Sequence, residues 1–517
     1  MKQKTWIISA LMCAMVIMVC LGVLHLLKEM TENNAPSGTV AEESTDHTEP
    51  ETDFAEEEET KEDIAETGPE EEESDVPVER EEGYYGWKQE LPQIFPSVPE
   101  EVPYEPPRLI LVTDLHYQSA QADDGGAAFQ LFVERGDGKV VEYLPELLEA
   151  FMDQVIEEHP SALVLSGDIT MNGEKINHEE LARGLMRVQD AGIPVLIVPG
   201  NHDINNPHAA VYFGEEKAET DPVTPEEFYN IYHMYGYDQA ISRDDASLSY
   251  VYQLDERNRL LMLDTCQYEP KNMVEGQLKV ETLRWADEQL KKAKEDGMNV
   301  LPIGHHNLLA QSRMYTTQCA MNNNGDVIEL FQKYELPLYL SGHLHVQRIR
   351  KHKAEPGAAD DSYGIMEIVT DALSIPPCQY ALLEWKRDGS MEYSTKAVDV
   401  SAWAARTGSQ NPDLLDFEGW SELYIQKLII DQIRGVVKNL GNDVEHSMAE
   451  VYASVYIDYY AGRRIDAKGI RSSKGYRWWE RNMPDSYLLK ELDAMIDDSD
   501  RDNNYMLLPE VNAAAEE

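Results

Sequence analysis

The chain of 517 residues is poor in cysteine, and its five cysteines follow no recognisable spacing. Three of them, Cys266, Cys319 and Cys378, lie in the body of the sequence without a C-x-x-C pair. An odd number at such wide spacing excludes a disulfide framework and a zinc-ribbon pattern. The sequence also lacks an H-E-x-x-H segment, which argues against a metallohydrolase that cleaves amide bonds.

Positive charge is scarce as well. Lysine and arginine number 44 against 96 aspartates and glutamates, for a formal net charge of −52. Residues 1–100 contain 25 acidic and 6 basic residues, so most of the negative charge lies beyond them. Such a surface repels a polymer of phosphates, and we expect no binding to nucleic acid. A bound metal cation would still let a small phosphate ester approach.

One long apolar run is present, from Trp6 to Leu27, just after Lys2 and Lys4. At 1.5 Å per residue it reaches roughly 33 Å as a helix, enough to cross the hydrocarbon core of a bilayer. The preceding lysines favour a cytoplasmic N-terminus. We therefore expect residues 1–30 to be an uncleaved signal anchor of a single-pass membrane protein whose body is extracytoplasmic. A cleaved signal peptide, which would give a secreted protein, is the alternative.

Residues 31–105 have the composition of a disordered tether. Between Ala41 and Glu82 there are 21 acidic residues and two basic ones, with almost no aliphatic side chains. A segment of this kind cannot bury enough apolar surface to fold, and its like charges extend it.

Residues 106–400 alternate between short apolar runs and helical patterns, which predicts a layered α/β domain. The helical patterns cover 143–158, 179–191 and 281–296, and 248–264 suggests a hairpin, so the sheet should be mixed. Residues 401–499 show amphipathic helical patterns and should form a helical C-terminal region. Residues 500–517 should be a flexible tail.

Five apolar runs of the α/β region end in aspartate, asparagine or histidine, most of them after a glycine. A buried strand that ends in this way delivers a polar side chain to its carboxyl end, where ligands bind in open α/β sheets. A single ending of this type is more often a turn or a helix cap, but five in order predict a metal site. The residues are Asp114 and His116, Asp168, Asn201 to Asp203, His305 and His306, and His343 and His345.

These side chains offer a mixed set of oxygen and nitrogen ligands, which suits borderline first-row metals such as manganese, iron and zinc. Asp114 with His116, and His343 with His345, are spaced two apart, so each pair can point to the same side of its strand end. His305 and His306 are adjacent and point in opposite directions, so we expect one ligand there and favour His305. Seven candidate ligands exceed one open site and suit two ions that share a carboxylate.

The ordered set D-x-H, G-D, G-N-H-D, G-H and G-H-x-H resembles the calcineurin-like metallophosphoesterase family over residues 108 to about 400. The resemblance implies a four-layer α/β/β/α sandwich with two metal ions at its strand ends. It also implies hydrolysis of small phosphomonoesters or phosphodiesters, cyclic nucleotides among them, by metal-activated hydroxide. A catalytically inactive surface-binding module on the same scaffold is the alternative function.

Carried over by position, the resemblance assigns ligands to each ion. Asp114, His116, Asp168 and His345 would hold one ion, and Asp168, Asn201, His305 and His343 the other, with Asp168 bridging. His202 would contact the phosphate and protonate the leaving oxygen, and Asp203 would orient its ring. The segment of Thr170, Gly173, Glu174 and His178 has two interpretations: a helix-start cap, or a feature shared with cyclic-nucleotide phosphodiesterases of the family.

Overall fold

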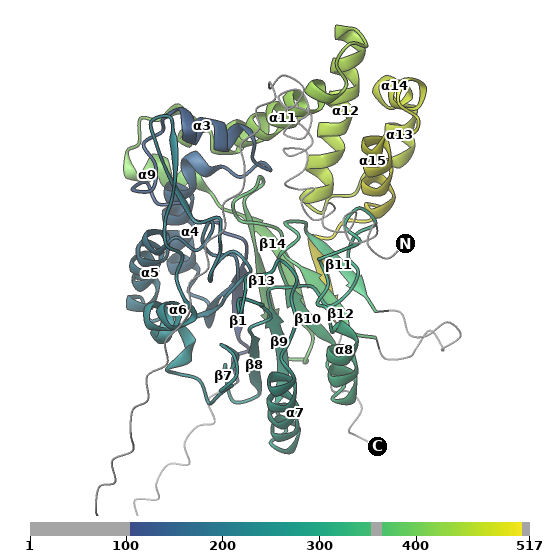
Figure 1. Ribbon diagram of the computed structural model, residues 1–517. Helices are drawn as coiled ribbons and strands as arrows, with labels where there is room; N and C mark the ends of the chain where they lie inside the picture. The colour runs from purple at the N-terminus through teal and green to yellow at the C-terminus, as the bar shows by residue number, and fades with distance from the viewer. Residues whose placement is uncertain (1–103, 353–363, 509–517) are drawn as a thin grey trace, which may run out of the picture. The chain divides into compact units, whose positions relative to one another are not determined.

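The computed structural model describes residues 104–352 and 364–508. The predicted signal anchor and nearly all of the predicted tether lie outside these ranges. Within them, no helix is long and apolar enough to cross a membrane. The described residues build two mixed β-sheets, a two-stranded hairpin, and helices on the sheets and in a C-terminal region (Figure 1).

The first sheet has six strands in the order β15-β14-β13-β1-β2-β3. β1, β2 and β3 run parallel, and β13, β14 and β15 extend the sheet by antiparallel pairing. β2 and β3 are buried along their whole length, as expected of parallel strands covered on both faces. The bounds are β1 Arg108–Val112, β2 Ala162–Ser166, β3 Val195–Val198, β13 Gln379–Trp385, β14 Met391–Ala397 and β15 Tyr505–Leu508.

The second sheet has seven strands in the order β11-β12-β10-β9-β8-β7-β6. Its central strands β8, β9, β10 and β12 are parallel, and antiparallel strands close both edges. The bounds are β6 Ser242–Arg243, β7 Tyr250–Gln253, β8 Asn258–Leu263, β9 Asn299–Gly304, β10 Leu338–Ser341, β11 Arg348–Lys351 and β12 Met366–Val369. The sheet is mixed, as the sequence predicts.

Alternation along β8 divides its side chains between two cores. Leu260 and Met262 belong to the buried cluster that also contains residues of the first sheet. Leu261 and Leu263 pack instead with residues of α7 (Val280–Glu295) and α8 (Asn324–Lys333). The second sheet therefore lies between the first sheet and these two helices.

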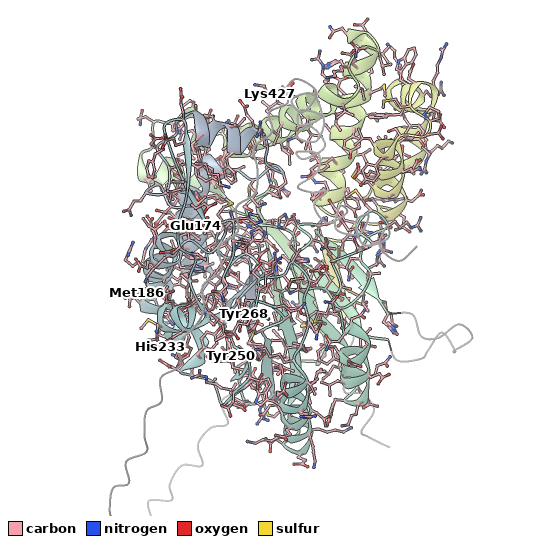
Figure 2. The ribbon with its side chains drawn as sticks, in the orientation of Figure 1. Glu174, Met186, His233, Tyr250, Tyr268 and Lys427 are labelled. Atoms are coloured by element: carbon pink, nitrogen blue, oxygen red, sulfur yellow. The ribbon has the colours of Figure 1, made fainter. Side chains whose placement is uncertain are left out.

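The two sheets also meet through a pair of hydrogen bonds made by Tyr250, on β7 (Figure 2). Its hydroxyl donates to the carbonyl of Ile197 on β3 at 3.1 Å and accepts from the amide of Ile197 at 3.0 Å. Helices α4 (Leu144–Glu158) and α5 (Lys175–Asp190) contact each other and contribute buried residues to the core shared with the first sheet.

The C-terminal region forms a second helical core. On α11, buried residues recur every four positions at Ser421, Ile425, Ile429 and Ile433, so one face of the helix is covered. Trp479 is fully buried, and its indole nitrogen donates to the Met448 carbonyl at 2.9 Å. The helices are α9 Val400–Thr407, α10 Pro412–Leu415, α11 Phe417–Val436, α12 Asn442–Tyr460, α13 Ala467–Ser472, α14 Lys474–Asn482 and α15 Tyr487–Asp498.

The secondary structure agrees with most of the elements that the sequence predicts in the α/β region. The predicted hairpin is confirmed as β7 and β8, which pair antiparallel. The helices predicted at 143–158 and 281–296 are confirmed as α4 and α7, whereas α5 begins before the predicted 179 because the polar residues of its first turn are buried. The remaining elements are α3 Ala127–Glu134, η2 Val141–Tyr143, β4 Ala210–Phe213, β5 Glu216–Glu219, α6 Pro225–Tyr232 and η3 His233–Tyr237.

The prediction of a flexible tail from residue 500 is wrong for β15. This strand pairs with β14 at the edge of the first sheet, and Leu508 is buried there. Two of its four residues, Tyr505 and Leu507, are more than half exposed. A short edge strand of this kind carries too little apolar pattern to be recognised from sequence.

Candidate metal centre

The seven predicted ligands follow parallel strands of both sheets, and six of them lie in two side-chain groups. Each ligand follows its strand by one to four residues, so the topology places side chains from distant segments at one edge. Asp114 and His116 follow β1, Asp168 follows β2, Asn201 follows β3, His305 follows β9, and His343 and His345 follow β10.

Four of these residues form one compact group: Asp114, His116, Asp168 and His345 offer ligand atoms that all lie within 4.8 Å of one another. The Nε2 atoms of His116 and His345 are 3.0 Å apart. Oδ1 of Asp114 lies 3.2 Å from Nε2 of His345. This convergence of two imidazoles and two carboxylates can hold a metal ion.

A second group forms on the other side of Asp168. Oδ2 of Asp168 lies 3.2 Å from Nε2 of His305 and 4.0 Å from Nε2 of His116, so the same oxygen faces both groups. The rings of His305 and His343 are 5.2 Å apart between centroids. Asn201 is buried at the end of β3. Oδ2 of Asp168 thus lies between an imidazole of each group.

His305 and His306 differ in how many of their ring nitrogens are hydrogen-bonded to neighbouring oxygens. Nδ1 of His305 donates to the Ser166 carbonyl at 3.0 Å, which leaves Nε2 as an acceptor. His306 uses both nitrogens: Nδ1 pairs with the Thr265 hydroxyl at 2.8 Å, and Nε2 donates to the Val274 carbonyl at 3.0 Å. Although His306 lies close to His305 and His343, its hydrogen bonds leave His305 as the better ligand.

Oδ1 of Asn201 is buried and has no hydrogen-bond partner among the described residues. Oδ1 of Asp114 and Nε2 of His305 are also buried, and each faces a charged partner of the centre at 3.2 Å, His345 and Asp168 respectively, without a hydrogen bond of good geometry. Leaving a buried acceptor unsatisfied costs about 1–3 kcal/mol each. Since these are lone-pair atoms of the predicted ligands, a bound cation would satisfy them, and the donor set therefore fits metal ions.

The backbone is strained where the ligands attach. Five of the seven adopt positive φ angles, which are uncommon for residues other than glycine and cluster at functional sites. The angles are 52° at Asp114, 45° at His116, 47° at Asp168, 73° at His343 and 56° at His345. The surrounding structure therefore holds these side chains in a geometry that an isolated turn would not choose.

The motif glycines permit close packing behind the ligands. A Cβ atom at Gly200 would lie 2.2 Å from Oδ1 of Asp168, and one at Gly342 would lie 2.6 Å from Oδ2 of Asp114. These separations are too short for any side chain. The glycines that precede Asn201 and His343 are thus required by contact between neighbouring strand ends.

Electrostatics favours the ligand protonation state at Asp168, His343 and His116. Burial raises the pKa of Asp168, but His305 and His202 outweigh it and hold the pKa well below the ordinary value. Burial lowers the pKa of His343, with a further contribution from His305, to about 4. Burial likewise holds the pKa of His116 well below its usual range. The carboxylate is thus ionised and both imidazoles are neutral near pH 7, as coordination requires.

At His305 and His345 electrostatics acts the other way. Burial lowers the pKa of each ring, but Asp168 outweighs it and raises the pKa of His305 to about 9, and Asp114 raises that of His345.

His202 lies beside this centre without belonging to either group. Its Nδ1 donates to the Met171 carbonyl at 2.8 Å and lies 3.1 Å from Oδ1 of Asn172. Its Nε2 is 4.0 Å from Oδ2 of Asp168, and 31% of the side chain is exposed. A fixed imidazole with one nitrogen facing the cluster from the solvent side can exchange a proton with a bound ester.

The expectation that Asp203 orients the His202 ring is wrong in this structure. The Asp203 carboxylate is buried and accepts hydrogen bonds from the amides of Ile169, Thr170 and Gly200. Both residues lie in the turn after β3, where Asp203 faces the loop after β2 while His202 faces the cluster. The Met171 carbonyl supplies the expected orientation instead.

The helix-start interpretation of Thr170, Glu174 and His178 holds for position only. Glu174 is the N-cap residue of α5, but its side chain makes no capping bond to the helix. The Thr170 hydroxyl donates to Oδ1 of Asp203 at 2.9 Å and lies 3.1 Å from Nε2 of His178, which is buried. The Glu174 carboxylate accepts from the Asn172 amide at 2.8 Å. These residues brace the loop whose carbonyl orients His202.

Two further partners of the ligands were not predicted from the sequence. Nδ1 of His345 lies 3.3 Å from Oδ2 of Asp137. Nε2 of His343 donates to the Gln318 carbonyl at 3.1 Å. Asp137 lies between two glycines and therefore has the sequence pattern of an ordinary turn, while a backbone carbonyl leaves no trace in sequence.

Two family models match the chain. The calcineurin-like phosphoesterase model matches residues 107–347, and the model for the C-terminal domain of cyclic nucleotide phosphodiesterase matches residues 399–502. A search of the curated proteins found no match.

Solved structures of similar fold are distant from this chain. A dimetal phosphatase from Danio rerio is 15% identical with a TM-score of 0.42, over 57% of this chain and 97% of its own. A purple acid phosphatase from yellow lupin seeds is 13% identical with a TM-score of 0.38, over 57% and 52%. PhoD is 10% identical with a TM-score of 0.32, over 56% and 66%. Similarities at this level carry no argument about the site.

Proposed function

Because residues 107–347 form a calcineurin-like phosphoesterase domain, we propose that the seven strand-end ligands hold two transition-metal ions that serve phosphate-ester hydrolysis. Asp114, His116 and His345 would bind one ion, Asn201, His305 and His343 the other, and Asp168 both. The observation that carries the proposal is Oδ2 of Asp168, which faces His116 on one side and His305 on the other. The donor set suits manganese, iron or zinc.

Two such ions supply charge neutralisation for the phosphate oxygens and lower the pKa of water toward neutrality. The side chains of the protein supply the remaining charge and the proton transfer. Asp168, with its depressed pKa, keeps a negative charge between the two groups at neutral pH. His202, held by Met171, presents Nε2 toward the substrate and can give its proton to the departing oxygen as the phosphorus–oxygen bond breaks. Asp203 braces the loop that holds Met171.

The substrate class belongs to the same proposal. The C-terminal family model carries the description of a cyclic nucleotide phosphodiesterase, and it accompanies the phosphoesterase model in this one chain. We therefore infer that the substrates are small phosphodiesters, with cyclic nucleotides the first to test. The formal charge of −52 supports a small substrate rather than a nucleic-acid polymer. The expected four-layer α/β/β/α order is also part of this interpretation, supported by the packing of α7 and α8 on the second sheet.

A substrate panel tests this function. Metal-stripped full-length protein would be reloaded with Mn²⁺, Zn²⁺ or Fe²⁺ and assayed against cyclic nucleotides, linear phosphodiesters and phosphomonoesters. We expect hydrolysis that depends on added metal and is fastest with a diester. Hydrolysis of monoesters alone would contradict the substrate class. No turnover of any ester by metal-loaded protein would favour the alternative of an inactive binding module.

The location of the protein is a separate proposal. The apolar run Trp6–Leu27, preceded by Lys2 and Lys4, supports a signal anchor with the catalytic domain outside the cytoplasmic membrane, or secretion if the segment is cleaved. Protease added to intact protoplasts should then cut within residues 31–100 and release a fragment that contains the phosphoesterase domain. Protection of that domain, while a known surface protein is digested, would refute the orientation.

A further inference from the structure

Asp137 occupies the position behind a predicted metal ligand. Its Oδ2 lies 3.3 Å from Nδ1 of His345, whose Nε2 faces Asp114 across the cluster. The Asp137 side chain is only 9% exposed. A carboxylate that accepts from Nδ1–H leaves Nε2 of the imidazole as the lone-pair atom and makes it a better metal ligand.

Lys139 balances the charge of this carboxylate. Its ammonium lies 2.6 Å from Oδ2 of Asp137. The carboxylate of Asp137 thus lies between the ammonium of Lys139 and the ring nitrogen of His345.

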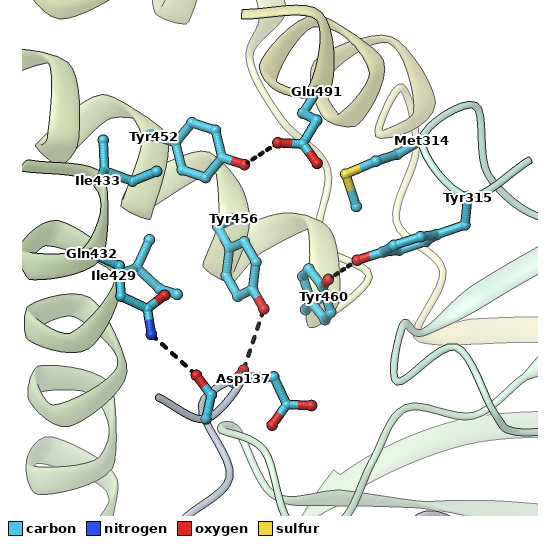
Figure 3. A pocket seen from close by; sticks show the side chains of 11 residues that line it. Asp137, Met314, Tyr315, Ile429, Gln432, Ile433, Tyr452, Tyr456, Tyr460 and Glu491 are labelled. Carbon is cyan, nitrogen blue, oxygen red and sulfur yellow. Dashed lines mark hydrogen bonds between the residues drawn. The ribbon is translucent and has the colours of Figure 1, made fainter. Parts of the chain in front are cut away.

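The loop that carries Asp137 is held by helices of the C-terminal region. From α11, Gln432 donates to the Gly136 carbonyl at 3.1 Å, and Tyr424 donates to the Lys139 carbonyl at 3.0 Å. From α12, the Tyr456 hydroxyl donates to the Asp137 carbonyl at 3.3 Å (Figure 3).

Packing adds to these hydrogen bonds. Gly138 has a φ of 106°, and a Cβ atom there would lie 2.9 Å from Cδ1 of Ile425 on α11. The cavity beside the loop, lined by Gly136, Asp137 and tyrosines of α12, has a volume of about 30 Å³, enough for one or two waters. The loop is therefore positioned by direct contacts with the helices.

We propose that Asp137 is a positioning residue for His345 and that α11 and α12 hold it in place, which makes the C-terminal helices part of the metal centre. This inference rests on the proposed function, because it requires His345 to bind a metal ion. It assigns the region 399–502 a role in metal affinity that does not depend on contact with substrate.

Manganese binding tests the role of Asp137. Calorimetric titration of metal-stripped full-length protein with Mn²⁺ should show affinity at one of two sites reduced by about 10–100-fold in Asp137→Ala. Asp137→Asn should lose less, because its amide oxygen still accepts from Nδ1 of His345 but carries no charge. Asp244→Ala is the matched control, since its buried carboxylate accepts from Ser247 and Thr282 elsewhere in the domain, and it should bind Mn²⁺ like the parent.

Hydrolysis provides a second readout. If Asp137 acts through the metal, excess Mn²⁺ should restore most of the activity of Asp137→Ala, whereas a misfolded variant would not recover. Equal Mn²⁺ affinity in Asp137→Ala, Asp244→Ala and the parent would overturn the inference. A parent protein that binds no Mn²⁺ would instead overturn the proposed function, so the two failures are distinguishable.

A pair of tyrosines tests the contribution of the helices. Tyr424→Phe removes the hydroxyl that donates to the Lys139 carbonyl and keeps the ring that stacks on Trp420. Tyr452→Phe is its control on α12, because its hydroxyl donates to Glu491. We expect Mn²⁺ affinity to fall by roughly 2–10-fold in Tyr424→Phe, the range of one hydrogen bond, and to be unchanged in Tyr452→Phe. Unchanged Mn²⁺ affinity in both variants would show that the helices do not contribute to metal binding.

Discussion

Asp168→Ala should lower phosphoesterase activity by at least about 10³-fold, because metal stabilisation of transition-state charge is worth several kcal/mol. It should also leave one metal ion or none bound per chain. Oδ2 of Asp168 faces Nε2 of His305 at 3.2 Å and Nε2 of His116 at 4.0 Å, so the change removes a ligand from both groups. Elemental analysis and the hydrolysis assay on the same preparation measure the two effects together.

Asn201→Ala is the matched control for this change. In the proposed centre Asn201 supplies one neutral oxygen to one group only. Its loss should therefore weaken the binding of a single ion and lower the activity less than Asp168→Ala does. Both variants should melt cooperatively in the metal-free state, which excludes unfolding as the cause. If Asp114→Ala released both ions while Asp168→Ala retained both, the bridging role of Asp168 would be wrong.

His202→Ala should keep both metal ions and slow hydrolysis by an amount that depends on the leaving group. General acid assistance is typically worth about 10²–10⁴-fold. A ribose oxygen needs a proton to depart, so a cyclic nucleotide should show a loss in this range. A nitrophenolate departs with little help, and the variant should lose comparatively little with a nitrophenyl ester. Rates are compared on protein loaded with equal metal.

The expected dependence on the leaving group follows from the orientation of the His202 ring. Nδ1 is occupied by the Met171 carbonyl, while Nε2 faces the cluster at 4.0 Å from Asp168. His208→Ala is a suitable control, because His208 is an exposed histidine on the same loop. Equal losses for good and poor leaving groups would assign His202 to phosphate binding rather than to proton transfer.

The ligands could be predicted from sequence because each one is encoded locally. A buried parallel strand, a glycine and a polar residue occur within a few positions, and parallel strands place their carboxyl ends at one edge. Asp168, His305 and His343 follow this rule. The positive φ angle of Asp168, by contrast, depends on contact with Gly200 from the neighbouring strand and leaves no pattern of its own.

Other features depend on contacts between distant segments and could not be predicted. Asp137 contacts His345 from a loop after α3, and hydrogen bonds from α11 and α12 hold this loop in place. Asp203 follows His202 directly, yet its carboxylate accepts hydrogen bonds from the amides of the loop after β2. β15 is defined by pairing with β14 rather than by its own sequence.

The metal content of the chain tests the central claim most directly. Protein purified from cells grown with ample manganese, iron and zinc would be analysed for metal by mass spectrometry and for protein by amino-acid analysis. Two groups of ligands that share Asp168 predict two transition-metal ions per chain, with a reproducible ratio between preparations. A stable content of one ion or fewer per chain, in protein that hydrolyses phosphate esters, would contradict the two-metal centre.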